Sequence, residues 1–588
     1  MDVLESILGT ASSYLWDRGI PFQGQEIPWV VIALLGTGLF LTVRLGFLQV
    51  RKLGHGFAVT SGIYDDPAEP GDVSHFQALT TALSATVGIG NIAGVALAIH
   101  WGGPGALFWM WMTALVGMAT KFSEVTLAQH YRQIESPDRD PRKWEGTVSG
   151  GPMYYIERGL GPRFKPLAVF FAVMLGLTAF LTGNAIQANT VADTFATEFA
   201  ISPWITGLVT TALVGMVIVG GIGRIGKVTG ILAPIMAAVY VAGALIILAG
   251  HYDQILPAFA LIFREAFNPT ASIAGAGGGI FLLTAIWGVK RGLFSNEAGQ
   301  GSAPIAHAAA KTDEPVSEGV VALVEPFIDT ILICTMTGLV IVVTGVWKDR
   351  VPTEITLGGG DLSYLVEMAP DRWQKVDEVP PIPVENGLYL EHGASAARIA
   401  WHEAPVEELF IDADMTQRFS GIVHAGDGNA VAEDGTTLTS LYGLAAESGA
   451  PLTMLAFQRG LPGEFGHIIV LMSVFLFAVS TAIAWSYYGD RCANYLFGTK
   501  MVFPYKVAFL TMHFVGAVLT LSVAWTLGDV FLGIVILPNL LALLLLSPKV
   551  AELTKSYFQR KPWIENREAH RKAAEQRKAG RQDRGRRS

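Results

Sequence analysis

Long apolar segments separated by short polar ones make up most of the 588-residue chain. About eleven of them are roughly 20 residues long, enough for a helix to cross the ~30 Å hydrocarbon core of a bilayer. Charged residues make up only 15% of the chain, against ~25% in a typical soluble domain. The pattern predicts an all-α polytopic membrane protein. The segments are residues 27–47, 76–100, 104–131, 166–186, 203–222, 228–250, 279–300, 317–346, 466–489, 503–524 and 528–547.

The second apolar segment is interrupted in its middle by glycines and a polar amide. Its run Ser84–Gly94 reads Ser-Ala-Thr-Val-Gly-Ile-Gly-Asn-Ile-Ala-Gly. Irregular backbone at membrane depth is tolerated only where it is buried in protein or lines a cavity. A span that breaks its own helix offers its freed backbone groups to a solute or an ion. The interruption therefore predicts a transporter with a binding site around residues 84–94.

The seventh segment carries a second predicted interruption. Residues 277–292 begin as an apolar helix, and we expect helical character to be lost near Trp287-Gly288. Five segments begin at each interruption, and an odd number of spans turns the second set upside down relative to the first. Paired interruptions in two such halves indicate a midplane binding site. The alternative is a pair of kinked helices whose glycines serve close packing.

This reading divides the chain into a 5+5 inverted repeat preceded by one extra N-terminal helix. Basic residues are concentrated in alternate short loops, with Lys290 and Arg291 counted on the inner side. We therefore expect a protein of the cell (inner) membrane with its N-terminus outside and its C-terminus in the cytoplasm. The basic tail is expected near anionic lipid. The predicted units are 1–75 (first span and loop), 76–250 (first repeat), 251–347 (start of the second repeat), 348–463 (a polar insert), 464–548 (end of the second repeat) and 549–588 (the tail).

Residues 348–463 do not fit the bilayer pattern. They are polar and turn-rich, with short alternating apolar stretches. We expect a small β-rich domain or a partly ordered loop on the outer side. Its carboxylates are expected to form a solvated face, and divalent-cation binding is the alternative. They include Glu354, Asp361, Asp377, Glu378, Glu407, Glu408, Asp412 and Asp414.

The residues around the two interruptions suit a small zwitterion. Half-helix amino ends favour a carboxylate, and half-helix carboxyl ends favour an ammonium group or a sodium ion. Small residues such as Ala85, Gly88 and Gly90 leave space for a small ligand. Few polar groups in an apolar pocket are typical of small-ligand sites. Candidate polar groups are Thr86, Asn91, Gln187 and Thr284, and candidate covering rings are Phe281 and Trp287.

Ionisable residues also fall inside predicted spans. Glu325 and Asp329 lie at i, i+4 on the eighth segment, and Lys121 and Glu124 lie at i, i+3 on the third. Such residues normally face a cavity or one another. Glu325 is a candidate proton carrier, or a partner of Lys121 or Arg291 in an inner gate. The alternative is a structural ion pair that holds helices together.

Other motifs give no catalytic function. Gly88-Ile89-Gly90 and Gly220–Lys227 superficially resemble nucleotide-binding loops, but neither follows a strand in a βαβ unit. Cys334 and Cys492 lack the partners of a metal site, and the histidines show no zinc spacing. We therefore expect no enzyme activity, no cofactor apart from a coupling ion, and no nucleic-acid partner.

Four longer runs resemble the alanine or glycine:cation symporter family, of the sodium:alanine symporter type. They are Gly102–Gly117, Gly150–Ile156, Arg291–Gly299 and Phe477–Gly489. The resemblance implies a leucine-transporter-like fold and secondary symport of alanine or glycine with sodium, or sometimes with a proton. The insert 348–463 departs from the family, whose outside loop at this place is usually much shorter.

The resemblance also implies roles for particular residues. The carboxylate of the amino acid would bind the freed amides around Gly88–Asn91. The implied substrate-contacting residues are Thr86, Gly88, Gly90, Asn91, Gln187, Thr284, Ile286 and Trp287. The implied sodium ligands are the hydroxyls of Ser480, Thr481 and Thr86 with backbone carbonyls near Ala85. For Ser480 and Thr481 the alternative is ordinary hydrogen bonding between helices.

The mechanism that these expectations favour is alternating access, in which sodium orders the broken second segment before the amino acid docks. One alternative is a sensor whose outer insert binds a ligand while the helices only transmit a signal. Another is a transporter of the same fold that is coupled to protons or carries another solute, such as a larger amino acid or a nucleobase.

Overall fold

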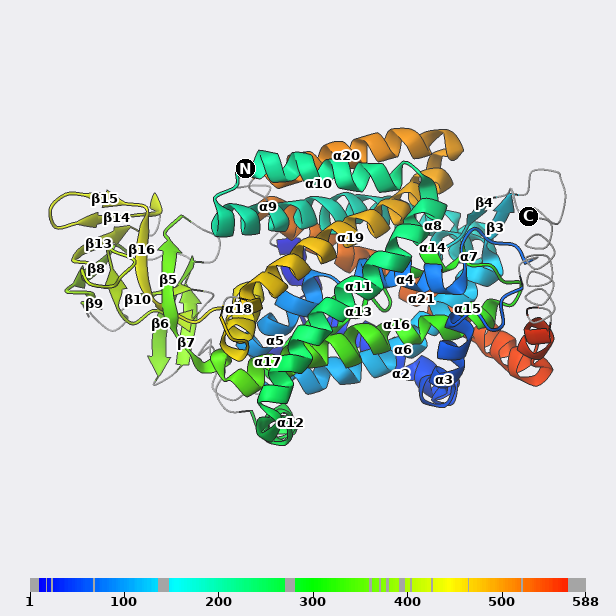
Figure 1. Cartoon of the computed structure of the whole chain (residues 1–588), viewed down its shortest axis with the longest axis horizontal. Helices are drawn as coiled ribbons and strands as arrows, with labels where there is room; N and C mark the ends of the chain where they lie inside the picture. Colours follow the sequence, from blue (N-terminus) through cyan, green and yellow to red (C-terminus); the bar gives the residue numbers. More distant parts are fainter. Residues whose placement is uncertain are drawn as a thin grey trace, which may run out of the picture.

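The structure is a computed structural model that describes residues 10–16, 18–22, 25–66, 69–135, 147–269, 281–358, 362–369, 372–376, 380–390, 397–401, 404–424, 427–463, 465–519, 522–568 and 570. A helical body forms most of the molecule, and a β-rich domain projects from one end of it (Figure 1). The opposite end, called the base below, carries α3 (Leu48–Thr60), α7 (Pro152–Leu160), β3 (Gln133–Glu135) and β4 (Thr147–Ser149) (Figure 1).

The helical body is built from two consecutive sets of helices. A short hairpin, β1 (Gly19–Phe22) and β2 (Gln25–Pro28), precedes them. The first set comprises α2 (Trp29–Arg44), α3, α4 (His75–Thr86), η1 (Gly90–Gly94), α5 (Val95–Gly102), α6 (Ala106–Tyr131), α7, η2 (Pro162–Phe164), α8 (Lys165–Phe180), η3 (Leu181–Ala185), α9 (Ile186–Phe199), α10 (Pro203–Ile218), α11 (Gly221–Gly250) and α12 (Tyr252–Phe267). The second set comprises α13 (Phe281–Asn296), α14 (Ala303–His307), α15 (Pro315–Ala322), α16 (Val324–Pro326), η4 (Phe327–Cys334), α17 (Thr335–Thr344), η5 (Val346–Lys348), α18 (Gly449–Gly460), α19 (Phe465–Phe497), η7 (Thr499–Met501), α20 (Val502–Val518) and α21 (Ser522–Arg560).

Several of these helices have the length and composition of membrane spans. Within the described residues, six helices are long and apolar enough to cross a membrane, and two bent helix pairs raise this number to as many as eight. Apolar side chains on the outside of α10 and α11, such as Leu208 and Ile231, are exposed, as expected for contact with lipid tails. The chain is thus a multi-pass membrane protein. The count of about eleven spans and the inverted repeat stay predictions.

The first predicted interruption is confirmed. α4 ends at Thr86, a new helical segment begins at Gly90, and the two parts are bent by 56°. Val87 between them is extended, with φ −73° and ψ 91°. The Gly88 N–H donates to the Asn91 side-chain oxygen at 2.8 Å. A side chain thereby supplies the acceptor that an amide at the start of a helix lacks.

The second interruption lies further along the chain than predicted. α13 continues through Trp287 and Gly288 to Asn296, so the predicted loss of helix near Trp287-Gly288 is wrong. A Cβ atom at residue 288 would lie 2.3 Å from the Ala106 carbonyl oxygen. This glycine therefore allows α13 to pack closely against α6 instead of breaking the helix. Residues 277–280 of the predicted segment lie outside the described residues.

The helix breaks instead between α13 and α14, at residues 297–302. Glu297, Gly299 and Gly301 have positive φ values of 53°, 90° and 79°, a conformation that two of them adopt without strain because they lack a Cβ. Lys290 and Arg291 consequently lie within α13 and not in an inner loop, where the charge pattern of the sequence had placed them.

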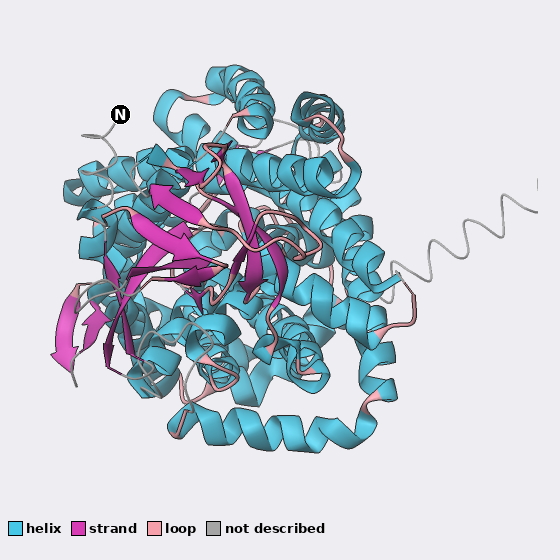
Figure 2. Ribbon diagram, turned by 90° about the vertical axis from the view of Figure 1, so that its left-hand side faces the viewer, coloured by secondary structure: helices cyan, strands magenta, loops and turns pink. Residues whose placement is uncertain are grey.

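The described residues of the insert form a β-rich domain, one of the two predicted alternatives, while its place on the outer side stays a prediction. Within its described residues the strands form antiparallel sheets in the orders β11-β10-β6-β7, β12-β16-β5 and β15-β14-β13-β8-β9. Figure 2, which looks at this end, shows the strands in front of the helices. The domain has an apolar core of its own, which includes Ile355, Ile399 and Phe419. The strands are β5 (Val351–Thr356), β6 (Leu362–Ala369), β7 (Arg372–Val376), β8 (Ile382–Glu385), β9 (Leu388–Tyr389), β10 (Ala397–Trp401), β11 (Ala404–Pro405), β12 (Leu409–Phe410), β13 (Gly421–His424), β14 (Asn429–Ala432), β15 (Thr437–Leu438) and β16 (Ser440–Ala445).

The acids of this domain do not gather into a metal site in the part of the chain that the structure describes, where no group of three or more His, Cys, Asp or Glu could hold a metal ion. Asp361, Asp377 and Glu378 lie outside the described residues.

The domain is joined to the body through two paired strands and a helix. β5 follows α17 and η5, β16 pairs with β5 along its whole length, and α18 follows β16. The Thr453 hydroxyl of α18 donates to the Ile92 carbonyl of η1 at 2.9 Å. Arg459 at the end of α18 forms an ion pair with Asp349. The last part of the predicted insert therefore packs directly on the first broken helix.

Candidate functional site

A cavity of about 200 Å³ lies between the two helix breaks. The first break forms one wall, and α13 with the residues that follow it forms another. Residues of η3, α9, α19 and α21 complete the lining. We call it the central cavity; its lining residues are Ala85, Thr86, Gly88, Ile89, Gly90, Ala93, Gly94, Leu97, Thr182, Ile186, Gln187, Arg291, Phe294, Glu297, Gln300, Thr481, Trp485 and Leu532.

Two buried oxygens of the lining residues lack partners. Within the described residues, Gln187 Oε1 and Thr182 Oγ1 have no hydrogen-bond partner. The Gln187 amide nitrogen donates to the Thr182 carbonyl at 3.1 Å, which fixes the orientation of the amide. A buried polar atom without a partner costs about 1–3 kcal/mol. A ligand that brings N–H groups into the cavity would remove this cost.

The central cavity also borders the amino end of a helix. Ile89 and Gly90 line it where the helical segment Gly90–Gly102 begins. Amides in the first turn have no acceptor within their own helix, and the helix dipole adds partial positive charge there. This wall suits a carboxylate, and the wall with Gln187 suits an ammonium group.

Asn91 lies behind the first break and does not line the cavity. Its Nδ2 donates to Asp329 Oδ1 at 2.6 Å and to Ser295 Oγ at 3.1 Å, while its oxygen accepts the Gly88 N–H. Asp329 further accepts hydrogen bonds from the hydroxyls of Ser295 at 2.8 Å and Thr330 at 2.6 Å. Asn91 thus fixes the broken backbone that faces the cavity.

Residues of the second break line the cavity although the sequence did not single them out. Glu297 accepts a hydrogen bond from the Ser302 hydroxyl at 2.5 Å, and Gln300 follows it in the break. Arg291 lies over the rings of Trp287 and Phe294, at 5.3 and 6.0 Å from their centroids. The signal was present in the run Asn296–Ser302, which combines a carboxylate with two closely spaced glycines.

The predicted sodium ligands lie close together. The Thr481 hydroxyl of α19 is 3.1 Å from the Ser84 carbonyl oxygen and 3.5 Å from that of Ala85. The Ser480 hydroxyl is 3.4 Å from the Ser84 carbonyl oxygen. Thr86, on the same turn, donates its hydroxyl proton to the Ala82 carbonyl at 3.2 Å. Oxygens of the first broken helix and of α19 thus converge where the sequence predicts an ion.

Besides Asn91, three further predicted substrate contacts do not line the central cavity. The Thr284 hydroxyl donates to the Gly102 carbonyl at 2.7 Å, and Ile286 is buried in α13. Trp287 stacks on Trp101, with ring centroids 5.3 Å apart. Trp287 lines a second cavity of about 180 Å³, which Lys290 and Arg291 also line. Among the predicted contacts, Thr86, Gly88, Gly90 and Gln187 line the central cavity.

The charged candidates form separate groups. Lys121 Nζ lies 2.8 Å from Glu325 Oε1, and both side chains are fully buried. Glu124 accepts hydrogen bonds from the Gly301 N–H at 3.1 Å and from the Asn539 amide at 2.5 Å. The pair of Lys121 with Glu325 was one of the predicted alternatives. Glu325 and Asp329 have different partners despite their i, i+4 spacing.

A cavity between two broken helices of a multi-pass protein is typical of a membrane transporter. The sequence model of the sodium:alanine symporter family matches residues 1–363 and 432–572. The chain belongs to that family, as its sequence motifs predicted, and it is a transporter and not an enzyme. Residues 364–431, within the β-rich domain, lie outside the match.

Curated relatives agree with this assignment. The sodium/alanine symporter AgcS of Methanococcus maripaludis is 38% identical over 94% of this chain and 97% of its own length. A putative sodium/proton-dependent alanine carrier protein, YrbD, of Bacillus subtilis is 32% identical over 90% of each chain. The probable sodium/glutamine symporter GlnT of the same organism is 30% identical over 95% of this chain and 92% of its own. The chain therefore carries out cation-coupled amino-acid symport.

Proposed function

We propose that the protein imports a small neutral amino acid, alanine or glycine, together with sodium by alternating access. The observation that carries this proposal is the central cavity, whose lining residues include two with buried unpartnered oxygens and others at a helix amino end. A zwitterion satisfies both walls at once. The M. maripaludis relative, named for sodium and alanine, supports the same substrate class.

The ligand is placed by its two charges. Its carboxylate accepts hydrogen bonds from the backbone amides of Ile89 and Gly90, and its ammonium group donates to Gln187 Oε1 and Thr182 Oγ1. Phe294 and Trp485 then cover the side chain of the amino acid. A small amino acid is the better candidate because glycines and alanines of the first break line the cavity and the M. maripaludis relative is named for alanine, although a glutamine symporter is also among the relatives.

Sodium occupies the point where Ser480, Thr481 and the carbonyls of Ser84 and Ala85 converge, with Thr86 beside them. Hard oxygen ligands suit this ion, and unwound carbonyls of a broken helix supply them in transporters. Bound there, the ion ties α19 to the first break and fixes the amides that receive the carboxylate. Sodium and amino acid therefore bind cooperatively.

The proposed architecture is an eleven-span body with the N-terminus outside and the C-terminus in the cytoplasm. After α2, the first repeat comprises α4 with α5, α6, α8 with α9, α10 and α11. The second comprises α13 with α14, α15 to α17, α19, α20 and α21. Each repeat then begins with its broken helix, which supports the leucine-transporter-like arrangement. Rocking of one group of helices against the other alternately exposes the cavity to each side.

Binding of labelled alanine to the purified protein tests the site. Alanine binding is expected to require sodium and to weaken about tenfold when Gln187 is replaced by leucine, since about 1.4 kcal/mol corresponds to one decade in Kd. The Ser480→Ala, Thr481→Ala double variant is expected to raise the sodium concentration needed. Ser473→Ala is the matched control, because among the described residues this buried hydroxyl of α19 bonds only to the Ile469 carbonyl of its own helix. Alanine binding that does not require sodium but depends on the proton concentration would favour a proton-coupled carrier.

A further inference from the structure

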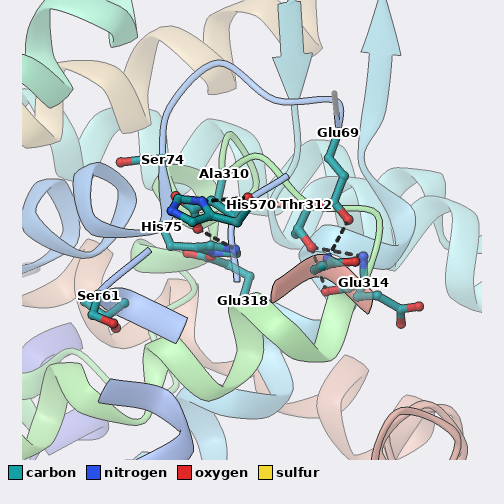
Figure 3. A network of polar contacts seen from close by, with 12 residues as sticks. Ser61, Glu69, Ser74, His75, Ala310, Thr312, Glu314, Glu318 and His570 are labelled. Atoms are coloured by element: carbon teal, nitrogen blue, oxygen red, sulfur yellow. Dashed lines mark hydrogen bonds and ion pairs between the residues drawn. The ribbon is translucent and has the colours of Figure 1, made fainter. Parts of the chain in front are cut away.

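Carboxylates and imidazoles alternate in a buried chain that begins at the base. Asp65 Oδ1 lies 3.8 Å from His75 Nε2, and His75 Nδ1 contacts Glu318 Oε2 directly. Glu318 Oε1 lies 2.5 Å from His307 Nδ1, and His307 Nε2 lies 3.6 Å from Glu325 Oε2. Each imidazole therefore faces a carboxylate at both of its ring nitrogens. Figure 3 shows His75 and Glu318 pointing toward one another.

This chain of carboxylate and imidazole side chains has one exposed and one buried end. The Asp65 side chain is 30% exposed, whereas Glu318, His307 and Glu325 are fully buried. Glu325 Oε1 in turn contacts Lys121. A fixed ion-pair network needs no connection to solvent. A path for protons needs an open end and a buried end, and this chain has both.

The chain connects the segments that flank the two helix breaks. His75 is the first residue of α4, which leads into the first break, and His307 is the last residue of α14, which follows the second. Glu318 lies on α15 and Glu325 on α16, in the next span. A proton added to this chain therefore alters contacts between both broken helices and the rest of the body.

Other charged groups surround the chain and bear on its protonation. Near the open end these are Glu69, Lys311 and His570, which face Asp65 or His75. Arg132 faces Glu318 and donates to the carbonyls of Ala308, Ala310, Thr312 and Pro70.

At the buried end, Lys121 and Glu124 of α6 and Glu297 of the second break face Glu325 or its partner Lys121. Glu297 also lines the central cavity. A change of charge at Glu325 therefore acts on a residue of the proposed substrate site.

We propose that this chain conducts a proton between the base and Glu325, so that amino-acid transport is accompanied by proton movement. The inference rests on the proposed function, since it assigns a second coupled ion to the same transport cycle.

The transfer conserves protons at each step. Asp65 gives a proton to His75 Nε2, and His75 releases its Nδ1 proton to Glu318. Glu318 rotates its carboxyl group and passes a proton to His307 Nδ1, and His307 releases its Nε2 proton to Glu325. Glu325 becomes neutral while Lys121 keeps its charge, and the ion pair between α6 and α16 is lost. Glu325 then releases its proton toward Glu297, whose charge acts on it and which lines the central cavity, and the proton leaves with the solvent of that cavity when it opens to the other side. Both imidazoles are left in the other tautomer and reset by ring rotation, and water at the base reprotonates Asp65.

The test uses the full-length protein in proteoliposomes that contain a trapped pH-sensitive dye. Valinomycin and equal potassium on both sides hold the membrane potential at zero, and sodium is equal on both sides. Labelled alanine is added outside, and alanine entry and internal pH are recorded together. A protonophore serves to cancel any pH signal. The variants are His307→Gln and, as matched control, His513→Gln, because His513 is a buried histidine whose Nδ1 bonds to Asn184 and not to a carboxylate.

The wild-type protein and His513→Gln are expected to show a protonophore-sensitive pH change that scales with alanine entry. His307→Gln is expected to lose the pH change while still exchanging labelled for unlabelled alanine, and the pH dependence of its exchange is expected to flatten. Alanine entry in the wild type without any pH change would overturn the proton path. An absence of alanine flux in the wild type would overturn the proposed function, and this inference with it.

Discussion

The Asn91 side-chain amide donates to Asp329 Oδ1 at 2.6 Å while its oxygen accepts the Gly88 N–H at 2.8 Å. Through this one side chain, a buried carboxylate of η4 holds the broken backbone of the first span. Ser295 of α13, one residue before that helix ends, bonds to the same carboxylate at 2.8 Å. The two breaks are therefore fixed relative to one another by polar contacts among side chains that do not line the central cavity.

Replacing Asn91 by alanine is expected to abolish alanine binding and to lower thermal stability. The change leaves the Gly88 N–H and an Asp329 oxygen without partners, and each buried unpaired group costs about 1–3 kcal/mol. The unfolding temperature in detergent and the binding of labelled alanine measure the two effects. Asn189→Ala is the control, since this partly buried amide, within the described part of the chain, donates only to the Leu519 carbonyl at 3.0 Å. Wild-type binding in Asn91→Ala would contradict a role for Asn91 in shaping the site.

Replacing Lys121 by methionine is expected to destabilise the protein by about 3–5 kcal/mol, because it leaves the buried Glu325 carboxylate without its cation. The double variant Lys121→Met, Glu325→Gln is expected to recover part of this loss. Lys549→Met is the control, as its pair with Glu552 is exposed and worth about 0–1 kcal/mol. Chemical or thermal unfolding of the three variants compares them. Equal losses for Lys121→Met and Lys549→Met would show that the buried pair adds nothing.

The sequence predicted the first break well because its signals were local. Glycines and an asparagine within eleven positions cannot continue an apolar span, and the structure bends there. The second break was misplaced because a glycine does not reveal whether it breaks a helix or allows close packing. Gly288 does the second, against Ala106, and only the three-dimensional contact with α6 distinguishes the two uses.

Polar contacts between distant segments were harder to predict than breaks. Lys121 could be named in advance, beside Arg291, as a possible partner of Glu325 because unpaired charges are costly inside a span. His75 and His307 carried no comparable signal, since each meets its carboxylates only after helices far apart in the chain have packed. The β character of the insert followed from alternation and turn residues, whereas the packing of α18 on the first break did not.

Shortening the insert is expected to preserve transport if α18 is kept. Replacing residues 358–438 by an Asn-Gly turn leaves β5 paired with β16, and with them the connection to α18. Removal of the whole segment 348–463 is expected to abolish uptake, because it takes away the Thr453 contact with η1. Uptake by the two variants in proteoliposomes makes the comparison. Loss of uptake in the first variant, with intact folding, would favour the sensor reading of the insert.

The residues that follow α21, 561–568, are expected to detach from the base as the pH rises. Burial raises the pKa of Glu69 to about 7, and Asn566 donates to this carboxyl at 3.2 Å. Because the pKa in the folded chain exceeds the ordinary value of 4.5, the packed state loses stability as pH rises from 4.5 through about 7. Trypsin cleavage at Arg567 is therefore expected to speed up between pH 6 and 8 relative to a Glu69→Gln variant. The same pH dependence of cleavage in the wild-type protein and in Glu69→Gln would contradict a role for the Glu69 carboxyl.

Sodium-coupled import is measured by the uptake of labelled alanine into proteoliposomes. An inward sodium gradient is compared with an equal potassium gradient at fixed pH and clamped membrane potential. We expect accumulation with sodium alone, its loss in the Ser480→Ala, Thr481→Ala double variant, and its retention in Ser473→Ala. Accumulation that is indifferent to sodium, or that survives loss of both hydroxyls, would contradict sodium coupling at this site.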